Sequence, residues 1–237
     1  MLHQDFVMKP SSRKRYWVRS MLGWRIFADS APTAAHYALA LLETHGLLKF
    51  LITQNVDRLH SKAGASNVLD LHGRNDLVKC LSCGLCLKRR LMQYQLELLN
   101  PQVAENFKGA LSNDRMRADG DVEIESEDID FVIPCCPRCG GILKPDVVFF
   151  GDSVPLEKVA TAKEHLLMCD GLLVAGTSLE VFSAFRLVST AAAAGVPIIM
   201  INQGPTRADR VKLNFAVRVD APVDDVMEAV LKILRLP

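Results

Sequence analysis

The stretch from Gly171 to Gly204 reads GLLVAGTSLEVFSAFRLVSTAAAAGVPIIMINQG, and it decides the fold class. An apolar run at 171–176 is followed by a helical pattern at 182–194 and by a second apolar run at 196–202. Strands that alternate with helices of this length are typical of βαβ units, in which helices cover both faces of a parallel sheet. The stretch therefore predicts an α/β fold with a Rossmann-like, doubly wound parallel sheet.

The same alternation continues on both sides of this stretch. Thr33 can cap a helix that Gly46 ends, because threonine favours the N-cap and glycine favours the position after the last turn. Residues 47–53 then read as a buried strand, since they are almost continuously apolar. Further elements are expected as helices at 156–168 and about 223–234 and as a short strand at 215–219.

Four cysteines give the strongest chemical signal in the sequence. They form two Cys-x-x-Cys pairs, Cys80 with Cys83 and Cys136 with Cys139, and glycine follows the second cysteine of each pair. Two such pairs supply the four thiolates of a tetrahedral Zn²⁺ site. Because protein ligands would fill every position, we expect the metal to be structural rather than catalytic. Buried cysteines without a metal are the alternative.

The alternation of strands and helices breaks at 78–144, where these cysteines, a basic cluster at 88–90 and an acidic run at 119–130 occur. The acidic run is interpreted as solvated loop, with a docking surface for a basic partner as the alternative. The predicted division is a helical part of a small domain at 1–30, the first part of the Rossmann-like domain at 31–77, a zinc-binding insertion at 78–145 and the second Rossmann-like part at 146–237.

The bulk composition excludes several classes of protein. The 237 residues carry 28 basic and 27 acidic side chains, a net charge of +1, so we expect no nucleic-acid partner. No window reaches the roughly 18 apolar residues that span a bilayer, so we expect no membrane partner. The seven cysteines argue against a full disulfide framework and for a reducing compartment. Cys86 and Cys135 also have usable ligand spacing, but neither precedes glycine, so we leave both out of the zinc site.

Polar residues follow three of the predicted strands at the points where the strands end. They are Gln54, Asn55 and Asp57 after the first, Gly176, Thr177 and Ser178 after the second, and Asn202, Gln203 and Gly204 after the third. Ligands of open α/β sheets bind beyond the carboxyl ends of the strands, where backbone N–H groups can hold a phosphate. Three such ends favour a nucleotide site, although each alone could be an ordinary turn. His72, between apolar neighbours, could equally be a core histidine.

These motifs, in this order, resemble those of the sirtuins, from His3 to about Leu231. The resemblance rests on Thr53-Gln54-Asn55-Val56-Asp57-Arg58-Leu59-His60, Leu71-His72-Gly73, the two cysteine pairs, Lys144 to Asp152 and Gly176-Thr177-Ser178-Leu179. Four features resemble the branch that contains the mitochondrial sirtuin 4 and its plant and bacterial class II relatives. They are Gln4-Asp5-Phe6-Val7, Arg15-Tyr16-Trp17, the long acidic insertion that ends in Gly120-Asp121-Val122, and Lys144 to Asp152. That branch implies the mitochondrial matrix in a eukaryote and the cytoplasm in a bacterium.

The resemblance implies an enzyme that removes acyl groups from protein lysines with NAD, giving nicotinamide and O-acyl-ADP-ribose. His72 would be the general base on a ribose hydroxyl. Acylated-lysine proteins would be the partners, and Val147, Val148 and Phe149 would pair with their backbone as an added strand. The implied NAD contacts are Gln54, Asn55 and Asp57 near the nicotinamide and its ribose, and Gly176, Thr177, Ser178, Asn202, Gln203, Gly204 and Val223 on the diphosphate and adenosine side.

Two family motifs do not occur among the 237 residues. The family has a first strand with a Gly-Ala-Gly-x-Ser loop, which holds the diphosphate, and then a Pro-Asp-x-Arg stretch. We therefore expect a sheet that lacks its first strand. Two alternatives to a deacylase stay open, a truncated and catalytically silent zinc-containing binding protein and an NAD-dependent protein ADP-ribosyltransferase. The sequence does not indicate the acyl-chain preference or the oligomeric state.

Overall fold

The computed structural model describes residues 1–106 and 130–236, which fall into two compact units. The first unit contains Met1–Ser30, Asn55–Arg58 and His72–Ser153, and the second contains Ala31–Gln54, Leu59–Leu71 and Val154–Pro237. The acidic run, apart from Asp130, lies outside the described residues. Among the described helices, none has the length and apolar character needed to cross a membrane.

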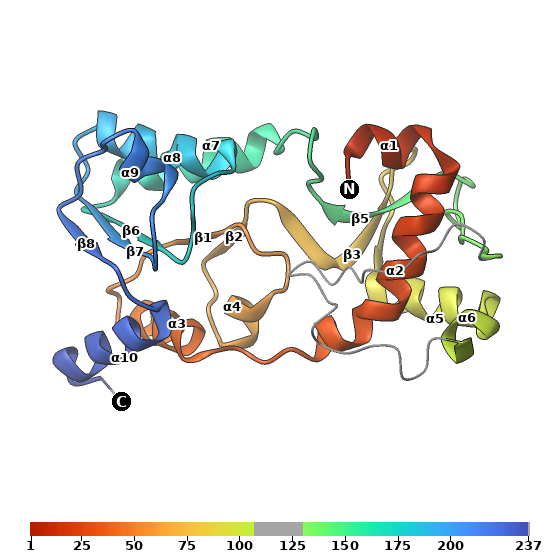
Figure 1. The fold of residues 1–237 in the computed structure, drawn as a ribbon, viewed down its shortest axis with the longest axis horizontal. Coiled ribbons are helices and arrows are strands. Elements are labelled where there is room, and N and C mark those ends of the chain that lie inside the picture. The colour runs from red at the N-terminus through yellow and green to blue at the C-terminus, as the bar shows by residue number, and fades with distance from the viewer. Residues whose placement is uncertain (107–129, 237) are drawn as a thin grey trace. The chain divides into compact units, whose positions relative to one another are not determined.

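The first unit combines helices with a three-stranded antiparallel sheet (Figure 1). Its elements are α1 (His3–Met8), α2 (Pro10–Asp29), β3 (Gly73–Cys80), β4 (Cys86–Lys88), α5 (Arg89–Leu99), α6 (Pro101–Asn106) and β5 (Leu143–Val147). Strand β3 lies in the centre and pairs with β4 on one side and β5 on the other. The core contains Phe6, Trp17, Val78, Met92 and Leu143, each no more than 1% exposed. Apolar burial of this kind supplies most of the unit's stability.

Arg89, in the basic cluster at 88–90, is fully buried in the first unit, whereas its two neighbours are exposed. Its guanidinium carbon lies 5.3 Å from the ring centroid of Trp17 and 5.0 Å from that of Trp24. It donates hydrogen bonds to Gln93 Oε1 at 2.8 Å and to Ser20 Oγ at 3.0 Å. Burial lowers the pKa of Arg89 to about 10, so the side chain stays charged at neutral pH. The aromatic faces and acceptors compensate for its lost hydration.

The second unit is built from parallel strands and helices, as predicted for an α/β fold (Figure 1). Its elements are α3 (Ala34–Thr44), β1 (Leu51–Thr53), α4 (Leu59–Lys62), β2 (Val68–Asp70), α7 (Leu156–Met168), β6 (Leu172–Ala175), α8 (Phe182–Ala193), β7 (Ile198–Ile201), α9 (Arg207–Arg210), β8 (Val217–Val219) and α10 (Val223–Leu234). Strand β1 pairs with β2, and β7 lies between β6 and β8. All three of these pairings are parallel.

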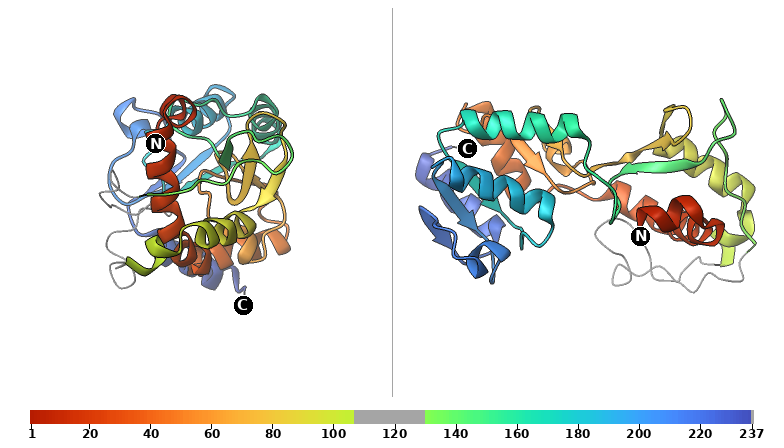
Figure 2. Two further views of the ribbon diagram at one scale, coloured as in Figure 1. Left: turned by 90° about the vertical axis from the view of Figure 1, so that its right-hand side faces the viewer. Right: turned by 90° about the horizontal axis from the view of Figure 1, so that it is seen from above.

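Helices cover both faces of the β6-β7-β8 sheet (Figures 1 and 2). On one face, α7 and α8 bury Leu166 and Val188 against Met200 of β7. On the other face, α3 and α10 pack together, and Leu42 and Met227 share a second core with the end of β7. A parallel sheet covered on both faces is the doubly wound arrangement that the sequence predicts.

Two helix predictions are confirmed at both ends, and one strand prediction is wrong over half its length. Helices α7 and α10 span the predicted residues, and Thr33 is the N-cap of α3. The strand predicted at 47–53 is only β1, Leu51–Thr53. The N–H groups of Leu47 and Leu48 instead both donate to the carbonyl of Leu42, at 2.9 and 3.1 Å, which closes the end of α3. Satisfying the terminal carbonyls of a helix competed here with extending the strand.

The parallel strands form two separate sheets in the described part of the chain, β1-β2 and β6-β7-β8. No backbone ladder joins β1 to β6 among these residues. Their carboxyl ends are linked by side chains, since Gln54 Nε2 donates to Thr177 Oγ1 at 3.0 Å. The α/β class and the helix layers agree with the sequence, and the sheet of the second unit is in two pieces.

Candidate functional site

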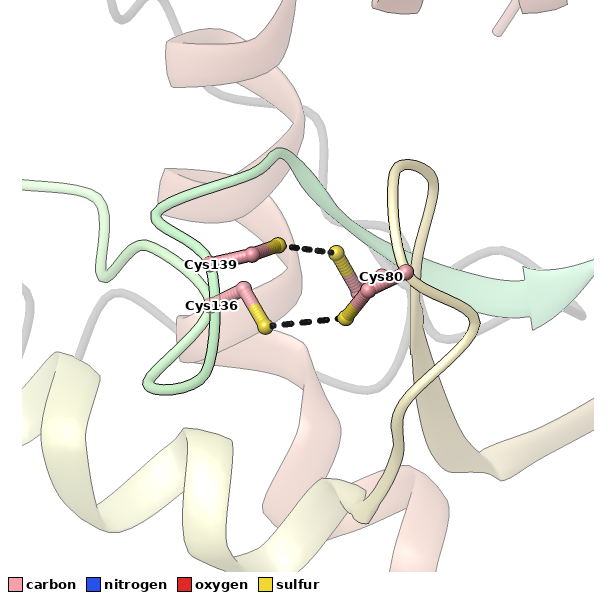
Figure 3. Close-up of side chains that lie close together, drawn as sticks. Cys80, Cys136 and Cys139 are labelled. Atoms are coloured by element: carbon pink, nitrogen blue, oxygen red, sulfur yellow. Dashed lines mark hydrogen bonds between the residues drawn. The ribbon is translucent and has the colours of Figure 1, made fainter.

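The four predicted zinc ligands come together in the first unit (Figure 3). The sulfurs of Cys80 and Cys139 lie 3.5 Å apart, those of Cys83 and Cys136 lie 3.7 Å apart, and all four lie within 4.8 Å of one another. Thiolates at about 2.3 Å from a central ion stand about 3.8 Å apart in a tetrahedron. The cluster therefore fits Zn²⁺, and four protein ligands make the site structural rather than catalytic.

Glycine ends each cysteine turn because the turn requires a positive φ. Gly84 and Gly140 both have a φ of +71°, a backbone conformation that glycine adopts at little cost. Their N–H groups donate to the carbonyls of Cys80 at 3.0 Å and Cys136 at 2.8 Å, which closes the two turns. The backbone N–H of Cys83 stabilises the thiolate of Cys80 and lowers its pKa to about 6. The first turn thus favours the deprotonated ligand that a metal needs, whereas the neighbouring thiols of Cys83 and Cys80 raise the pKa of Cys139.

The remaining cysteines take no part in this cluster. Cys86 and Cys135 are exposed and lie outside the group of four sulfurs, as predicted from the missing glycines. None of the seven cysteines forms a disulfide in the structure.

His72 lies in the turn between β2 and β3 and is half-buried. Its carbonyl accepts the N–H of Val148 at 2.8 Å. The next residue, Gly73, has a φ of +87° and pairs in register with Val147. A Cβ on Gly73 would lie 2.0 Å from the carbonyl oxygen of Asp146, so no other residue fits there without moving the strand. The structure therefore places His72 directly beside the segment that is predicted to bind the substrate.

The segment Val147–Phe149 runs from the end of β5 into the turn that follows. Among the described strands, β5 lies at an edge of its sheet, and an edge can accept an added strand. The ring of Phe149 packs 5.4 Å from that of Phe6 and 5.3 Å from that of Tyr16, which anchors the segment in the core of the first unit.

Asn55 and Asp57 belong to the first unit together with His72, whereas Gln54 belongs to the second. Between them, the carbonyl of Val56 accepts the N–H of Asn75 of β3 at 2.8 Å. The three polar residues predicted after the first strand are therefore divided between the two units.

The predicted NAD contacts after β6 lie together in the second unit. Gly176 has a φ of +62°, and its N–H donates to the carbonyl of Ile201, the last residue of β7, at 3.0 Å. A Cβ on Gly176 would lie 3.4 Å from Val223 Cγ2, so these two residues are neighbours. Thr177 Oγ1 accepts the hydrogen bond from Gln54 at 3.0 Å. The ends of β1, β6 and β7 and the start of α10 therefore meet.

The turn Asn202-Gln203-Gly204 follows β7 and is held from several sides. Asn202 Nδ2 donates to the carbonyls of Gln203 at 3.0 Å and Gly204 at 3.1 Å. Arg218 of β8 donates to the carbonyls of Asn202 at 2.8 Å and Gly204 at 2.7 Å. The N–H of Gly204 donates to Asp220 Oδ1 at 2.9 Å. These bonds fix the backbone of the turn before any ligand arrives.

Sequence reasoning assigned no role to several residues that shape these sites. Arg218 braces the turn after β7, and the carbonyl of Ser178 accepts the N–H of Arg207 of α9 at 2.8 Å. Lys144 is buried beside the predicted substrate segment, with 6% of its surface exposed. The available signal was a basic residue inside an apolar strand, as in Val217-Arg218-Val219 and Leu143-Lys144-Pro145.

The comparison with known proteins identifies the family. The sequence pattern of the Sir2 family matches residues 2–183. The chain belongs to the Sir2 family. This sirtuin is 49% identical over 229 residues to an NAD-dependent protein deacetylase of Bordetella bronchiseptica, which covers 96% of the chain and 80% of the relative. It is 43% identical over 242 residues to an NAD-dependent protein deacylase of Arabidopsis thaliana, which covers 98% of the chain and 64% of the relative.

Solved sirtuin structures share the fold. A complex of Sir2 with a p53 peptide and NAD⁺ superimposes with a TM-score of 0.76 at 24% identity and covers 99% of this chain and 82% of that one. A complex of a Sir2 homologue variant with ADP-ribose has a TM-score of 0.72 at 28% identity and covers 98% of this chain and 77% of that one. In this sirtuin, the positive φ of Gly176 and Gly204 at adjoining strand ends suits the close approach of a dinucleotide.

Proposed function

We propose that this sirtuin removes acyl groups from protein lysines with NAD and water, giving free lysine, nicotinamide and O-acyl-ADP-ribose. The observation that carries the proposal is the bond between the carbonyl of His72 and the N–H of Val148, at 2.8 Å. It fixes the proposed base and the proposed substrate segment in one antiparallel pair. A base must lie within reach of the proton that it takes, and this pairing supports such a placement.

Each group of residues has a proposed part in the reaction. NAD, when bound, supplies the ribose carbon that receives the acyl oxygen and nicotinamide as the leaving group. His72 takes the proton from a ribose hydroxyl through its neutral imidazole. Val147, Val148 and Phe149 hold the substrate through its backbone, so that one enzyme can accept many sequences. Acylated proteins are therefore the proposed partners, with no nucleic acid and no membrane among them.

The NAD contacts are proposed residue by residue. Asn55 and Asp57 would hold the nicotinamide and its ribose, with Gln54 beside them. The diphosphate and adenosine would lie on the residues that follow β6 and β7 and begin α10, which are Gly176, Thr177, Ser178, Asn202, Gln203, Gly204 and Val223. The dense bonding of the Asn202–Gly204 turn supports this, because a rigid backbone loses little entropy when a ligand binds. Zinc would hold the two cysteine turns and take no part in the chemistry.

Within the family, the chain is proposed to belong to the branch of the mitochondrial sirtuin 4 and its plant and bacterial class II relatives. The motifs given above for this branch support it, and it would place the protein in the mitochondrial matrix or the bacterial cytoplasm. The division at 1–30, 31–77, 78–145 and 146–237 likewise stays a proposal.

The test is a turnover assay on residues 1–237 with NAD⁺ and peptides that carry acetyl-, propionyl- or longer acyl-lysine. We expect nicotinamide release together with loss of the acyl group and formation of O-acyl-ADP-ribose. Nicotinamide release with ADP-ribose attached to protein would support the transferase alternative. A zinc-loaded protein that releases no nicotinamide with any peptide would support the silent alternative and overturn the proposal.

A further inference from the structure

Lys144 is a buried lysine that lies against the proposed substrate segment. Its side chain is 8% exposed, and it comes from the second residue of β5. Its ammonium group donates a hydrogen bond to the carbonyl of Val147 and lies 4.4 Å from the centroid of the Phe149 ring. A buried ammonium is costly unless it has acceptors and an opposite charge close by, so this placement needs compensation.

The compensating charge comes from the far end of the same segment. Asp152 Oδ2 lies 3.4 Å from Lys144 Nζ. The same carboxylate oxygen lies 3.0 Å from His3 Nδ1 of α1, and the N–H of Asp152 donates to the carbonyl of Phe149 at 3.0 Å. Lys144 and Asp152 therefore precede and follow Val147–Phe149 in the sequence, and their charged groups meet.

Three consecutive residues of the segment each have a contact that holds them, and Lys144 makes two of the three contacts. The carbonyl of Val147 is held by Lys144, the N–H of Val148 by the carbonyl of His72, and the ring of Phe149 by the ammonium of Lys144. The segment lies at a sheet edge, and these contacts hold it there. A segment fixed before binding loses less conformational freedom when a partner strand adds to it.

We propose that Lys144, with Asp152 as its counter-charge, is a positioning residue that holds Val147–Phe149 in the conformation that pairs with the substrate backbone. The inference rests on the proposed function, because it takes this segment as the substrate-binding edge. Lys144 itself does not touch the reacting atoms. Its loss should therefore weaken peptide binding and leave the chemical step largely intact.

The test compares Lys144→Met with Lys144→Arg, which keeps the charge, in the full chain. The control is Lys79→Met, which removes an exposed lysine from the position paired with Lys144 across the sheet. For Lys144→Met we expect the peptide KM to rise about tenfold, the range for loss of a charged hydrogen bond, with kcat and the KM for NAD⁺ nearly unchanged. Lys144→Arg should recover much of the binding, and Lys79→Met should match the wild type.

Two further measurements separate positioning from loss of the fold. Zinc content should stay at the wild-type level, while amide hydrogen exchange in the peptide that spans 143–150 should become faster in Lys144→Met. If Lys144→Met does not fold, Lys144→Gln replaces it, with a smaller rise in KM expected. Unchanged KM and unchanged exchange in a folded variant would overturn the inference.

Direct binding of an acyl-lysine peptide distinguishes this inference from the proposed function. If the wild type binds the peptide without turnover and Lys144→Met binds it more weakly, the positioning role stands and the deacylase proposal fails. If the wild type turns over and Lys144→Met is unaffected, the deacylase proposal stands and the positioning role fails. If the wild type neither binds nor turns over, both are overturned.

Discussion

At the scale of single residues, the position of His72 depends on the glycine that follows it. Gly73 allows the turn to press against β5, because any Cβ would collide with the carbonyl of Asp146. The main-chain bond from Val148 then sets where His72 lies. This main-chain bond thus places the His72 residue beside the sheet edge that β5 forms.

Replacing His72 by Ala should lower deacylation by about 10² to 10⁴, the usual contribution of a general base. The main-chain bond of residue 72 to Val148 does not need the side chain, so the fold should be retained. Steady-state turnover with an acyl-lysine peptide measures the loss, and thermal unfolding checks the fold. His45→Ala, at an exposed position after α3, is the control. Unchanged turnover in His72→Ala would make this residue a core histidine.

At the scale of elements, local signals predicted what depends on local physics. Helix α10 begins after Pro222 and α3 begins after Thr33, so their starts were visible in the sequence. The cysteine turns were equally visible, since spacing and glycine determine them. The strand at 47–53 was overextended because its first half is used to close α3 and to stack Phe50 on His165, with ring centroids 3.6 Å apart.

Contacts between different elements could not be predicted from the sequence, because they do not depend on local physics. Arg89 lies among charged neighbours in the sequence and yet is buried between Trp17 and Trp24. Arg218 of β8 contacts the turn that follows β7, and the counter-charge of Lys144 is Asp152, which follows the segment Val147–Phe149. Each of these placements is set by packing between elements. A local pattern can mark a basic residue in an apolar strand, as at Arg218 and Lys144, but it does not identify the residue's partner.

The assignment of the zinc ligands can be tested by metal content and by the local stability of the adjoining strands. We expect about one Zn²⁺ per chain, and the double change Cys136→Ser and Cys139→Ser should abolish its binding, because two ligands cannot hold a structural site. Metal binding of this kind is coupled to local folding, so amide exchange around β3 and β5 should become faster. Metal analysis of the purified proteins is the measurement, with Cys86→Ser as the control outside the cluster. Full zinc in the double variant would refute the ligand assignment.

Asp224 ties α10 to the start of α3 and should make that contact dependent on pH. Its Oδ1 accepts the N–H of Ala35 at 2.7 Å, and this bond, followed by one from Thr33, lowers the pKa of Asp224 below its usual value. A lowered carboxyl pKa gives stability that is present above the unfolded-state pKa and is lost as the pH falls through the folded-state pKa. The contribution should therefore be complete at neutral pH and fade below about pH 4.

The variant Asp224→Asn tests this contact. We expect it to lower the free energy of unfolding by about 1 kcal/mol at pH 7, the size of a helix-capping interaction, and by less as the solution becomes acidic. Chemical denaturation at several pH values measures the difference. Asp225→Asn, at the exposed neighbouring position, should show no such trend. An equal loss of stability at pH 7 and pH 3 would show that the carboxylate charge is not involved.

At the scale of the whole molecule, the proposed NAD contacts predict that the cofactor stabilises the folded chain. A ligand that binds only the folded state adds about 2.7 kcal/mol at a concentration of 100 Kd. For a chain of this size each kcal/mol raises the Tm by about 2 to 4 °C, so saturating NAD⁺ should raise it by about 5 to 10 °C. Arg218→Met should reduce this rise, since it removes the donors that fix the carbonyls of Asn202 and Gly204. Arg186→Met, at an exposed position on α8, should keep it in full.

Thermal unfolding with and without millimolar NAD⁺ measures the effect for all three proteins. A wild-type Tm that does not move with NAD⁺ would mean that the strand-end residues of the second unit do not suffice to hold the cofactor. An equal rise in wild type and Arg218→Met would place binding elsewhere than on the Asn202–Gly204 turn.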